Sequence, residues 1–493
     1  MTKVVIIGGG PAGLTAAYEL GKARVPCTVL EKDLVLGGIA RTVCHNGYLF
    51  DIGGHRFFTK VAAAEKMWRE VLGDDFIRCR RLSRIYYNKR FFHYPLQLGD
   101  TLIGLGLWNS ALILGSYIWA RLFPTRSEET FEDWICNRFG RRVYRTFFKT
   151  YTEKVWGIPC NQIGAEWAAQ RIKGLSLFEA VKHALLKQAG RRPGRTVKSL
   201  IDSFHYPRQG PGMMWNTVGA LVEKEGNTIR LGASVEQINR TNGHVSSVRI
   251  NVNGRSELVE GTHFLSSMPI QELITKLNPP APADVIEAAR GLNYRDFLTV
   301  AVIVNEPDLF PDNWIYIHDP SVRVGRIQNF KNWSPHMVPD QTKTCLGLEY
   351  FCTVGDDLWQ MSDPALIELA KQEVQALGLA RSAGIDDGAV VRMPKAYPVY
   401  DTGYRERLET IRKFLDGITN LQAIGRNGMH KYNNQDHSML TAMLAVRNIL
   451  GAKYDLWQVN EEQHYHEAGT EEQGLVEDIQ NLASTQPSVP QRL

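Results

Sequence analysis

The sequence predicts an α/β fold that begins with a Rossmann-type dinucleotide-binding domain. The apolar run at residues 4–7 is typical of a buried parallel strand, and it leads into the pattern G-x-G-x-x-G at residues 8–13. A helical pattern follows at residues 14–20, and a second strand at residues 27–30 ends at Glu31. Strand, glycine turn, helix and acid in this order indicate a site for an adenine dinucleotide.

Each glycine of this turn has a predicted purpose. Gly8 permits the tight turn, Gly10 lets the backbone approach a pyrophosphate, and Gly13 lets the helix pack closely on the strand. Unpaired N–H groups at the start of the helix would bind the phosphates. Glu31 is placed to bind the ribose hydroxyls.

Composition narrows the class of protein. A chain of 493 residues with 44% hydrophobic content can bury the cores of about two or three domains. The net charge of +5 gives no reason to expect a nucleic-acid partner, and the basic clusters at residues 78–90 and 137–149 are better explained as solvated faces than as anion sites. Seven widely spaced cysteines without C-x-x-C argue against a disulfide framework and against a zinc site, and they fit a reducing cytoplasm. The first residues already form a fold element, so we expect no signal peptide.

Two motifs after the second strand point to a flavin. The string GGIARTV places Gly38 and Arg41 just beyond that strand, and it resembles the second FAD contact of the amine oxidase and protoporphyrinogen oxidase superfamily. The resemblance implies FAD rather than NAD, bound by a glutathione-reductase-like domain. In DIGGHRFF, Gly53 and Gly54 would let the backbone lie against a flavin ring that His55 faces. The alternative for His55 is a hydrogen-bonded structural histidine.

Later segments are similar to the same superfamily. Residues 205–226 resemble its glycine turn before a helix, and residues 229–250 alternate as a hairpin in which Val235 falls where such proteins contact the adenine. Residues 262–274 would return a strand to the nucleotide-binding sheet. The resemblance implies an FAD-binding domain assembled from residues 1–95, 199–278 and 395–453, a helical insertion at 96–198, a mixed, strand-rich substrate domain at 279–394, and a flexible tail at 454–493.

The stretch IGRNGMHKYNNQDHSML at residues 424–440 combines polar groups with the start of a helix. Asp436 can cap this helix, because the residues that follow form an apolar face with helical spacing. If the positive end of the helix points at the flavin, it stabilises the negative charge of the reduced form. Arg426 could pair with a flavin carbonyl or with a substrate phosphate.

The whole string resembles a more particular family, the UDP-galactopyranose mutases. Gly425, Arg426 and residues 431–432 match its C-terminal signature. His430 replaces an aromatic residue of that signature, and residues 434–435 replace an acidic-methionine pair.

The same resemblance suggests roles for other residues. Arg326 and Tyr397 would bind the substrate pyrophosphate, and Trp156 would pack a nucleotide or a sugar. His55 would face the flavin, and Tyr432 would help to stabilise a departing diphosphate. No metal is implied.

One departure concerns the mobile loop R-x-P-V-R of the mutases. The aligned string here is RIKGL, which keeps Arg171 for substrate binding but has Leu175 at the second arginine. Leucine cannot make a bidentate phosphate contact, although Lys173 could supply a point charge. We therefore expect a substrate that differs from that of the mutases.

Residues 101–120 form a stretch without charge that is long enough to cross a bilayer. Asn109, two serines and three glycines oppose insertion. A single span would also leave Gly8 and Arg426 on opposite sides of the membrane, whereas one FAD site needs both. We expect a buried helix pair in the substrate domain. A monotopic membrane surface and a tunnel for an apolar substrate are the alternatives.

These observations predict an FAD-dependent enzyme of the cytoplasm that acts on a nucleotide- or lipid-linked sugar in polysaccharide or glycoconjugate biosynthesis. If it resembles the mutases in mechanism, it uses reduced FAD, has no net redox change, and relies on Arg326, Tyr397 and Tyr432 to stabilise the leaving diphosphate. One alternative is an oxidoreductase or desaturase of an apolar substrate, similar to protoporphyrinogen oxidase. Another is a flavin-binding protein without turnover that docks on a membrane or on a glycosyltransferase complex.

Overall fold

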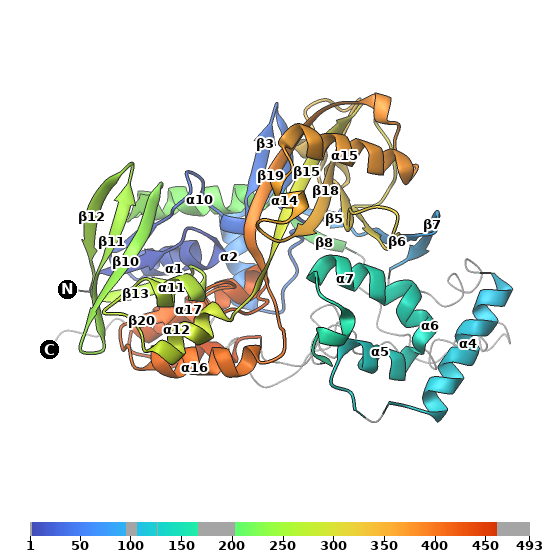
Figure 1. Cartoon of the computed structure of the whole chain (residues 1–493). Coiled ribbons are helices and arrows are strands. Elements are labelled where there is room, and N and C mark those ends of the chain that lie inside the picture. Colours follow the sequence, from blue (N-terminus) through green and yellow to red (C-terminus); the bar gives the residue numbers. More distant parts are fainter. Residues whose placement is uncertain (1, 95–105, 126, 166–202, 461–493) are drawn as a thin grey trace.

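The described residues form three large sheets with helices packed on them, two two-stranded sheets and a separate group of helices (Figure 1). The computed structural model describes residues 2–94, 106–125, 127–165 and 203–460. Parts of the predicted helical insertion lie outside the described residues, and these parts include Arg171, Lys173 and Leu175. Most of the predicted tail also lies outside them.

The first sheet is parallel and carries the glycine turn. Its five strands run in the order β20-β13-β1-β2-β9. Their bounds are Leu421–Ala423 (β20), His263–Ser266 (β13), Val4–Ile7 (β1), Cys27–Leu30 (β2) and Thr228–Arg230 (β9). Helix α1, Pro11–Lys22, packs on the sheet. It also packs against two other helices, Pro211–Lys224 (α10) and Gln435–Ile449 (α17). Helices cover the sheet, which explains why every residue of β1 is apolar and buried.

The local predictions for this sheet are confirmed. Strand β1, helix α1 and strand β2 follow the predicted order, and Glu31 comes directly after β2. The predicted returning strand is β13, which pairs with β1. The predicted hairpin is the antiparallel pair β10–β11 of a four-stranded sheet. The bounds in that sheet are Arg255–Glu260 (β12), His244–Val252 (β11), Ala233–Thr241 (β10) and Leu277–Asn278 (β14).

The largest sheet has seven strands and runs in the order β19-β15-β18-β17-β16-β6-β7. Their bounds are Ile385–Pro398 (β19), Tyr294–Val304 (β15), Thr344–Cys352 (β18), Arg326–Asn329 (β17), Trp314–Ile317 (β16), Ser83–Tyr87 (β6) and Arg90–His93 (β7). Helix α15, Asp363–Ala376, packs on β15 and β19. Strands β6 and β7 belong to this sheet rather than to the nucleotide-binding sheet, because β6 pairs in parallel with β16. That partner lies far along the chain, so local sequence patterns do not reveal it.

Smaller elements connect the three sheets. Two further strand pairs are Thr42–His45 (β3) with Tyr48–Asp51 (β4), and Phe76–Arg80 (β5) with Ser203–Pro207 (β8). The other helices outside the helical group are Ala62–Leu72 (α2), Ile270–Thr275 (α11), Ala283–Arg290 (α12), Phe330–Trp333 (α13), Asp357–Gln360 (α14) and Tyr404–Asp416 (α16).

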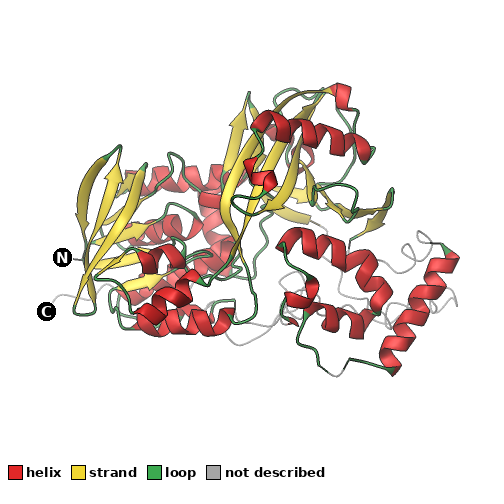
Figure 2. Ribbon diagram, in the orientation of Figure 1, coloured by secondary structure: helices red, strands yellow, loops and turns green. Residues whose placement is uncertain are grey.

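The helical group stands apart from the strands in Figure 2. Its helices are Leu107–Leu122 (α4), Phe131–Phe139 (α5), Arg141–Val143 (α6) and Thr150–Trp156 (α7), with a π-helical turn at Tyr144–Lys149. Within the described part of residues 101–120, the prediction of a buried helix pair is wrong. This part forms the single helix α4, whose apolar side chains are largely exposed. Across the described ranges, no helix combines the length and the hydropathy that crossing a membrane requires.

A buried carboxyl group joins the hairpin β3–β4 to the elements behind it. Asp51 accepts hydrogen bonds from the Tyr206 hydroxyl and from Thr42 Oγ1, the latter at 2.8 Å. Thr42 Oγ1 in turn accepts the N–H of Gly212 in α10 at 3.0 Å. Burial raises the pKa of Asp51 to about 7, even though both hydrogen bonds act in the opposite direction.

The raised pKa predicts a pH-dependent stability that depends on Asp51. In the unfolded chain this carboxyl group ionises near pH 4, so between about pH 4 and pH 7 folding takes up a proton and stability falls as the pH rises. Asp51→Asn should remove this part of the pH dependence. Urea-unfolding midpoints across that range measure it, with the exposed Asp74→Asn as the control. An unchanged slope in Asp51→Asn would contradict the assignment.

Candidate active site

One large cavity of about 1440 Å³ collects most of the residues that the sequence singles out. Residues that follow the strands β1, β2, β13 and β20 line it, so it opens at the carboxyl edge of the parallel sheet. Of the predicted cofactor-binding residues, those that line it are Gly8, Gly10, Glu31, Gly38, Arg41, Gly54, Val235, Gly425 and Asp436. The predicted catalytic residues that line it are His55, Arg326, Tyr397, Arg426 and Tyr432. The volume exceeds the roughly 300–1,000 Å³ of common ligand pockets, so a dinucleotide and a substrate can share it.

Two glycine turns form the floor of the cavity. Gly8 has φ +105°, and a Cβ on Gly13 would lie 1.9 Å from the Gly8 carbonyl oxygen, so Gly13 serves the packing of α1. Gly10 is different, because a Cβ there would meet nothing closer than the Cα of Gly38, at 3.8 Å. The second turn is held to the first by the Gly37 N–H, which donates to the Gly9 carbonyl at 2.9 Å. The two turns leave a cradle that a side chain would fill.

Glu31 stabilises this cradle. Its Oε2 accepts the Gly9 N–H at 2.6 Å, and its Oε1 accepts the Asp33 N–H at 2.8 Å. Arg41 forms an ion pair with Asp33 at 2.6 Å. The buried Glu31 therefore holds the glycine turn in place, and its contact with a ribose stays a prediction.

Helix α17 points its N-terminal turn into the cavity. The prediction that Asp436 caps this helix is wrong: the N-cap is Asn434, whose backbone is extended and whose N–H donates to His437 Nδ1 at 3.2 Å. Asp436 is the second helical residue, and its Oδ1 accepts the His437 N–H at 2.9 Å. The positive end of the helix faces the cavity, as predicted for the stabilisation of a negative charge.

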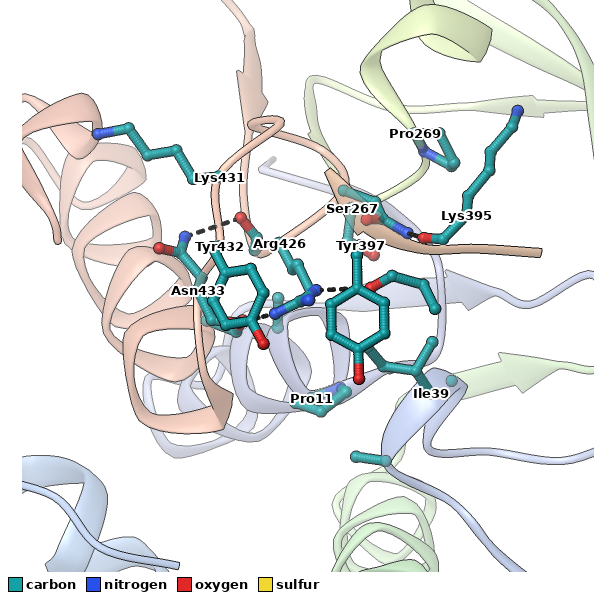
Figure 3. A pocket seen from close by; sticks show the side chains of 18 of the residues that line it. Pro11, Ile39, Ser267, Pro269, Lys395, Tyr397, Arg426, Lys431, Tyr432 and Asn433 are labelled. Carbon is teal, nitrogen blue, oxygen red and sulfur yellow. Dashed lines mark hydrogen bonds between the residues drawn. The ribbon is translucent and has the colours of Figure 1, made fainter. Parts of the chain in front are cut away.

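Arg426 lies against two tyrosines at one end of the cavity (Figure 3). Its guanidinium carbon is 4.1 Å from the ring centre of Tyr432 and 5.0 Å from that of Tyr397. The guanidinium donates to the carbonyl oxygens of Ala396 at 2.9 Å and Asn433 at 3.2 Å. Within the described part of the chain, no carboxylate pairs with Arg426, so its charge is not cancelled.

Arg326 has a contrasting environment. It lies directly opposite Glu349 in the antiparallel pair β17–β18, and its Nε donates to Glu349 Oε2 at 2.5 Å. Glu349 is fully buried and also accepts from Gln328 Nε2 at 2.7 Å. Burial acts to lower the pKa of Arg326, but the charge of Glu349, together with nearby tyrosines, outweighs this effect and raises it. The role of Arg326 as a phosphate ligand stays a prediction, but a carboxylate already balances its charge.

His55 is neutral near pH 7. Burial, and to a smaller extent the nearby cations Arg326 and Arg426, lower its pKa to about 4, although a backbone hydrogen bond with Gly53 acts in the opposite direction. A Cβ on the preceding Gly54 would lie 2.9 Å from Gln328 Nε2, so the loop passes close to the end of this side chain. A neutral imidazole can donate or accept a hydrogen bond or relay a proton.

Three residues of the resemblance make contacts other than those that the resemblance implies. Trp156 is buried behind the site, with its ring centre 6.5 Å from that of Tyr397, so it supports the tyrosine and does not line the cavity. Lys431 points away in Figure 3, because its ammonium donates to the carbonyl oxygens of Trp457 and Val459. His430 is fully buried and packs edge-on against Tyr294, with centres 4.8 Å apart. It thus occupies an aromatic environment.

The sequence analysis missed Glu349 and Gln328. The signal for Glu349 was available, since it is the one charged residue in the apolar strand LGLEYFC. Gln328 lies two residues after Arg326 and therefore on the same face of β17. The sequence analysis also missed Trp314 and Tyr316, which line the cavity from the neighbouring strand β16.

Comparison with known families agrees with this geometry. Residues 6–71 match the NAD(P)-binding Rossmann-like domain, and residues 145–403, more than half of the chain, match the flavin containing amine oxidoreductase family. The chain belongs to the flavin-containing amine oxidoreductase family. This family member is an FAD-dependent enzyme.

Similar proteins have different activities. Protoporphyrinogen oxidase 2 of Arabidopsis thaliana is 24% identical over 461 residues, which cover 83% of this chain and 87% of the relative. A crystal structure of reduced UDP-galactopyranose mutase has a TM-score of 0.81 at 22% identity and covers 94% of this chain and 98% of the mutase. A structure of putrescine oxidase bound to putrescine has a TM-score of 0.61 at 16% identity, with coverage of 92% and 99%. At these identities the two structures establish the shared fold.

The lining of the cavity fits FAD independently of these similarities. Gly10 and Gly38 leave backbone open where a pyrophosphate would lie, and the N-termini of α1 and α17 face the same space. When bound, FAD supplies a centre that takes up and returns two electrons.

Gly10→Val should give a folded protein without FAD in this amine oxidoreductase. Gly10 has an extended backbone and an open Cβ position, so the valine side chain would protrude into the cradle without disturbing α1. Absorbance near 450 nm and FAD release on denaturation measure occupancy, and circular dichroism measures folding. Gly384→Val, at another open position, should keep its FAD. Full flavin occupancy in Gly10→Val would show that the cradle is assigned wrongly.

Proposed function

We propose that the enzyme acts on a nucleotide- or lipid-linked sugar that carries a diphosphate, in the biosynthesis of a polysaccharide or glycoconjugate. The supporting observation is the uncancelled charge of Arg426 inside the FAD cavity. An arginine fork binds phosphate oxygens through paired hydrogen bonds, and Arg426 is partly buried, so water screens its charge less than that of an exposed arginine.

The neighbours of Arg426 suit this role. The rings of Tyr397 and Tyr432 are stacked, with centres 5.7 Å apart, and they hold the guanidinium in one orientation. Burial raises the pKa of Tyr397, so its hydroxyl stays protonated and can donate to a phosphate oxygen. His55, neutral and on the same cavity wall, can hold or relay a proton.

Arg326 contributes less in this proposal than the resemblance to the mutases implies. Because Glu349 balances its charge, its remaining N–H groups can orient a phosphate but add little net attraction. Leu175 stands in place of the second loop arginine, which also favours a substrate contact different from that of the mutases. The diphosphate is thus held mainly from the Arg426 side, and the substrate differs from that of the mutases.

A second candidate is the net oxidation or desaturation of an apolar substrate. The aromatic lining favours it, since Trp314, Tyr316, Trp333 and Phe297 face the cavity. The similarity to protoporphyrinogen oxidase 2 covers most of both chains and supports the same alternative.

Arg426→Ala should weaken binding of the diphosphate-linked sugar by about 2–5 kcal/mol, because the phosphate loses its charged partner. Calorimetric titration of the FAD-loaded enzyme measures this. The affinity of Arg426→Lys should fall between that of the unchanged enzyme and that of Arg426→Ala, since lysine keeps the charge and loses the fork.

FAD content is the control for both variants. Loss of FAD in Arg426→Ala would assign the arginine to the cofactor instead of the substrate. Unchanged binding in a fully loaded Arg426→Ala protein would reject the proposed phosphate contact.

The redox requirement separates the two candidate functions. On the first, product should form from a nucleotide sugar only with enzyme that has been reduced beforehand, and oxygen uptake should not follow product. Anaerobic incubation of reduced and oxidised enzyme with a panel of nucleotide sugars, followed by absorbance and product analysis, tests this. Stoichiometric bleaching of the oxidised enzyme by its substrate would instead establish the oxidase.

A further inference from the structure

Helix α4 presents its apolar side to solvent. Trp108 is 76% exposed, Trp119 66% and Leu122 67%, and Ile118 is also exposed. The two tryptophans are eleven residues apart, which places them on the same face about three turns from each other. Phe123, just after the helix, continues this apolar face and packs on Trp119 with ring centres 4.6 Å apart.

The opposite, more polar side of α4 faces the protein. Ser116 Oγ accepts the Arg142 N–H at 3.2 Å, and Gly140 packs against the backbone of Ser116 and Tyr117. Ile113 is the buried apolar side chain on this side. A surface helix of a globular protein normally buries its apolar stripe, whereas α4 exposes most of its apolar side chains.

Arginines lie at the end of α4 and on the helical segment packed beside it. Arg121 lies in the last turn of α4, and Arg141, Arg142 and Arg145 are exposed on the adjoining helical segment. Between residues 107 and 149 the sequence has seven Arg and Lys residues and four Asp and Glu residues, and α4 itself contains no acid. Glu132 is 4.0 Å from Arg141 and offsets part of this charge.

A small polar cavity of about 330 Å³ lies between α4 and this segment. Arg90 and Arg142 line it, together with Asn88 and Asn109. Two arginines and two amides suit a phosphate group.

We propose that α4 and its flanking arginines dock the enzyme on the surface of an anionic lipid bilayer. The apolar side would enter the boundary between headgroups and acyl chains, with tryptophans at the interface and arginines on the lipid phosphates. At 16 residues, α4 is about 24 Å long, shorter than the roughly 30 Å hydrocarbon core, so it would lie in the plane of the membrane.

A lipid surface explains the face better than a second copy of the chain. A symmetric dimer across α4 would bring the arginines at the end of α4 and on the adjoining segment of both copies towards one another, and their charges would repel. Anionic headgroups neutralise them instead. Figure 1 shows α4 at the outer edge of the molecule, far from the parallel sheet, so a flat surface can reach it.

Flotation with lipid vesicles tests the proposal on the full FAD-loaded chain. The protein should float with vesicles that contain about 30% phosphatidylglycerol in phosphatidylcholine, bind pure phosphatidylcholine much more weakly, and lose affinity when salt rises from about 0.1 M to 0.5 M. Trp108→Ser combined with Trp119→Ser should reduce binding by at least about tenfold. Arg121→Gln combined with Arg142→Gln should remove the preference for anionic lipid.

The matched control is Leu258→Ser, which removes a 60% exposed leucine on β12 of another sheet and should bind like the unchanged protein. FAD absorbance and the melting temperature should stay the same in all variants. If the protein fails to float with either vesicle, the proposal is wrong. If light scattering also shows a dimer that the tryptophan substitutions dissociate, α4 is a self-association surface instead.

Discussion

The close contact between Gly13 and the carbonyl oxygen of Gly8 sets the position of everything around the cavity. With no side chain at Gly13, α1 can start directly above β1 and point its N-terminus into the cavity. A Cβ on Gly425 would lie only 2.9 Å from Ala12 Cβ, so the C-terminal motif also packs against the first turn of α1. Arg426 reaches the cavity because the preceding residue has no side chain.

The charges in the cavity are distributed unevenly, and this distribution defines the chemistry. Arg326 and Glu349 form a partly buried pair that costs desolvation and gives little net field. Arg426 has carbonyl and aromatic partners, which hold it in place without cancelling its charge. An anionic group in the cavity would therefore be attracted towards the Arg426 end. The same cations, together with burial, keep His55 neutral.

The cavity and the proposed docking face lie in different parts of the molecule. The parallel sheet supplies the glycine cradle, and the seven-stranded sheet supplies Arg326, Gln328 and Glu349 from adjacent strands. The helical group adds little to the cavity in the described ranges, but it carries an exposed apolar face at its outer edge. Catalysis and docking would thus use different surfaces of one chain, and each can be altered without the other.

Local sequence determined the nucleotide-binding half of this protein. Strand β1, the glycine turn, α1 and Glu31 are close in sequence, and hydrophobic periodicity and glycine spacing are local signals, so each was predicted correctly. Tertiary structure alone decided the pairing of Arg326 with Glu349 and the joining of β6 to β16, because strand register depends on partners far along the chain. Tertiary structure also decided which side of α4 faces solvent, since an apolar run has the same sequence pattern whether it packs on a protein core or on a membrane. Trp156 matches its family motif in sequence, but it packs behind Tyr397 and does not line the cavity. The ammonium of Lys431 is held by backbone carbonyls that lie far along the chain.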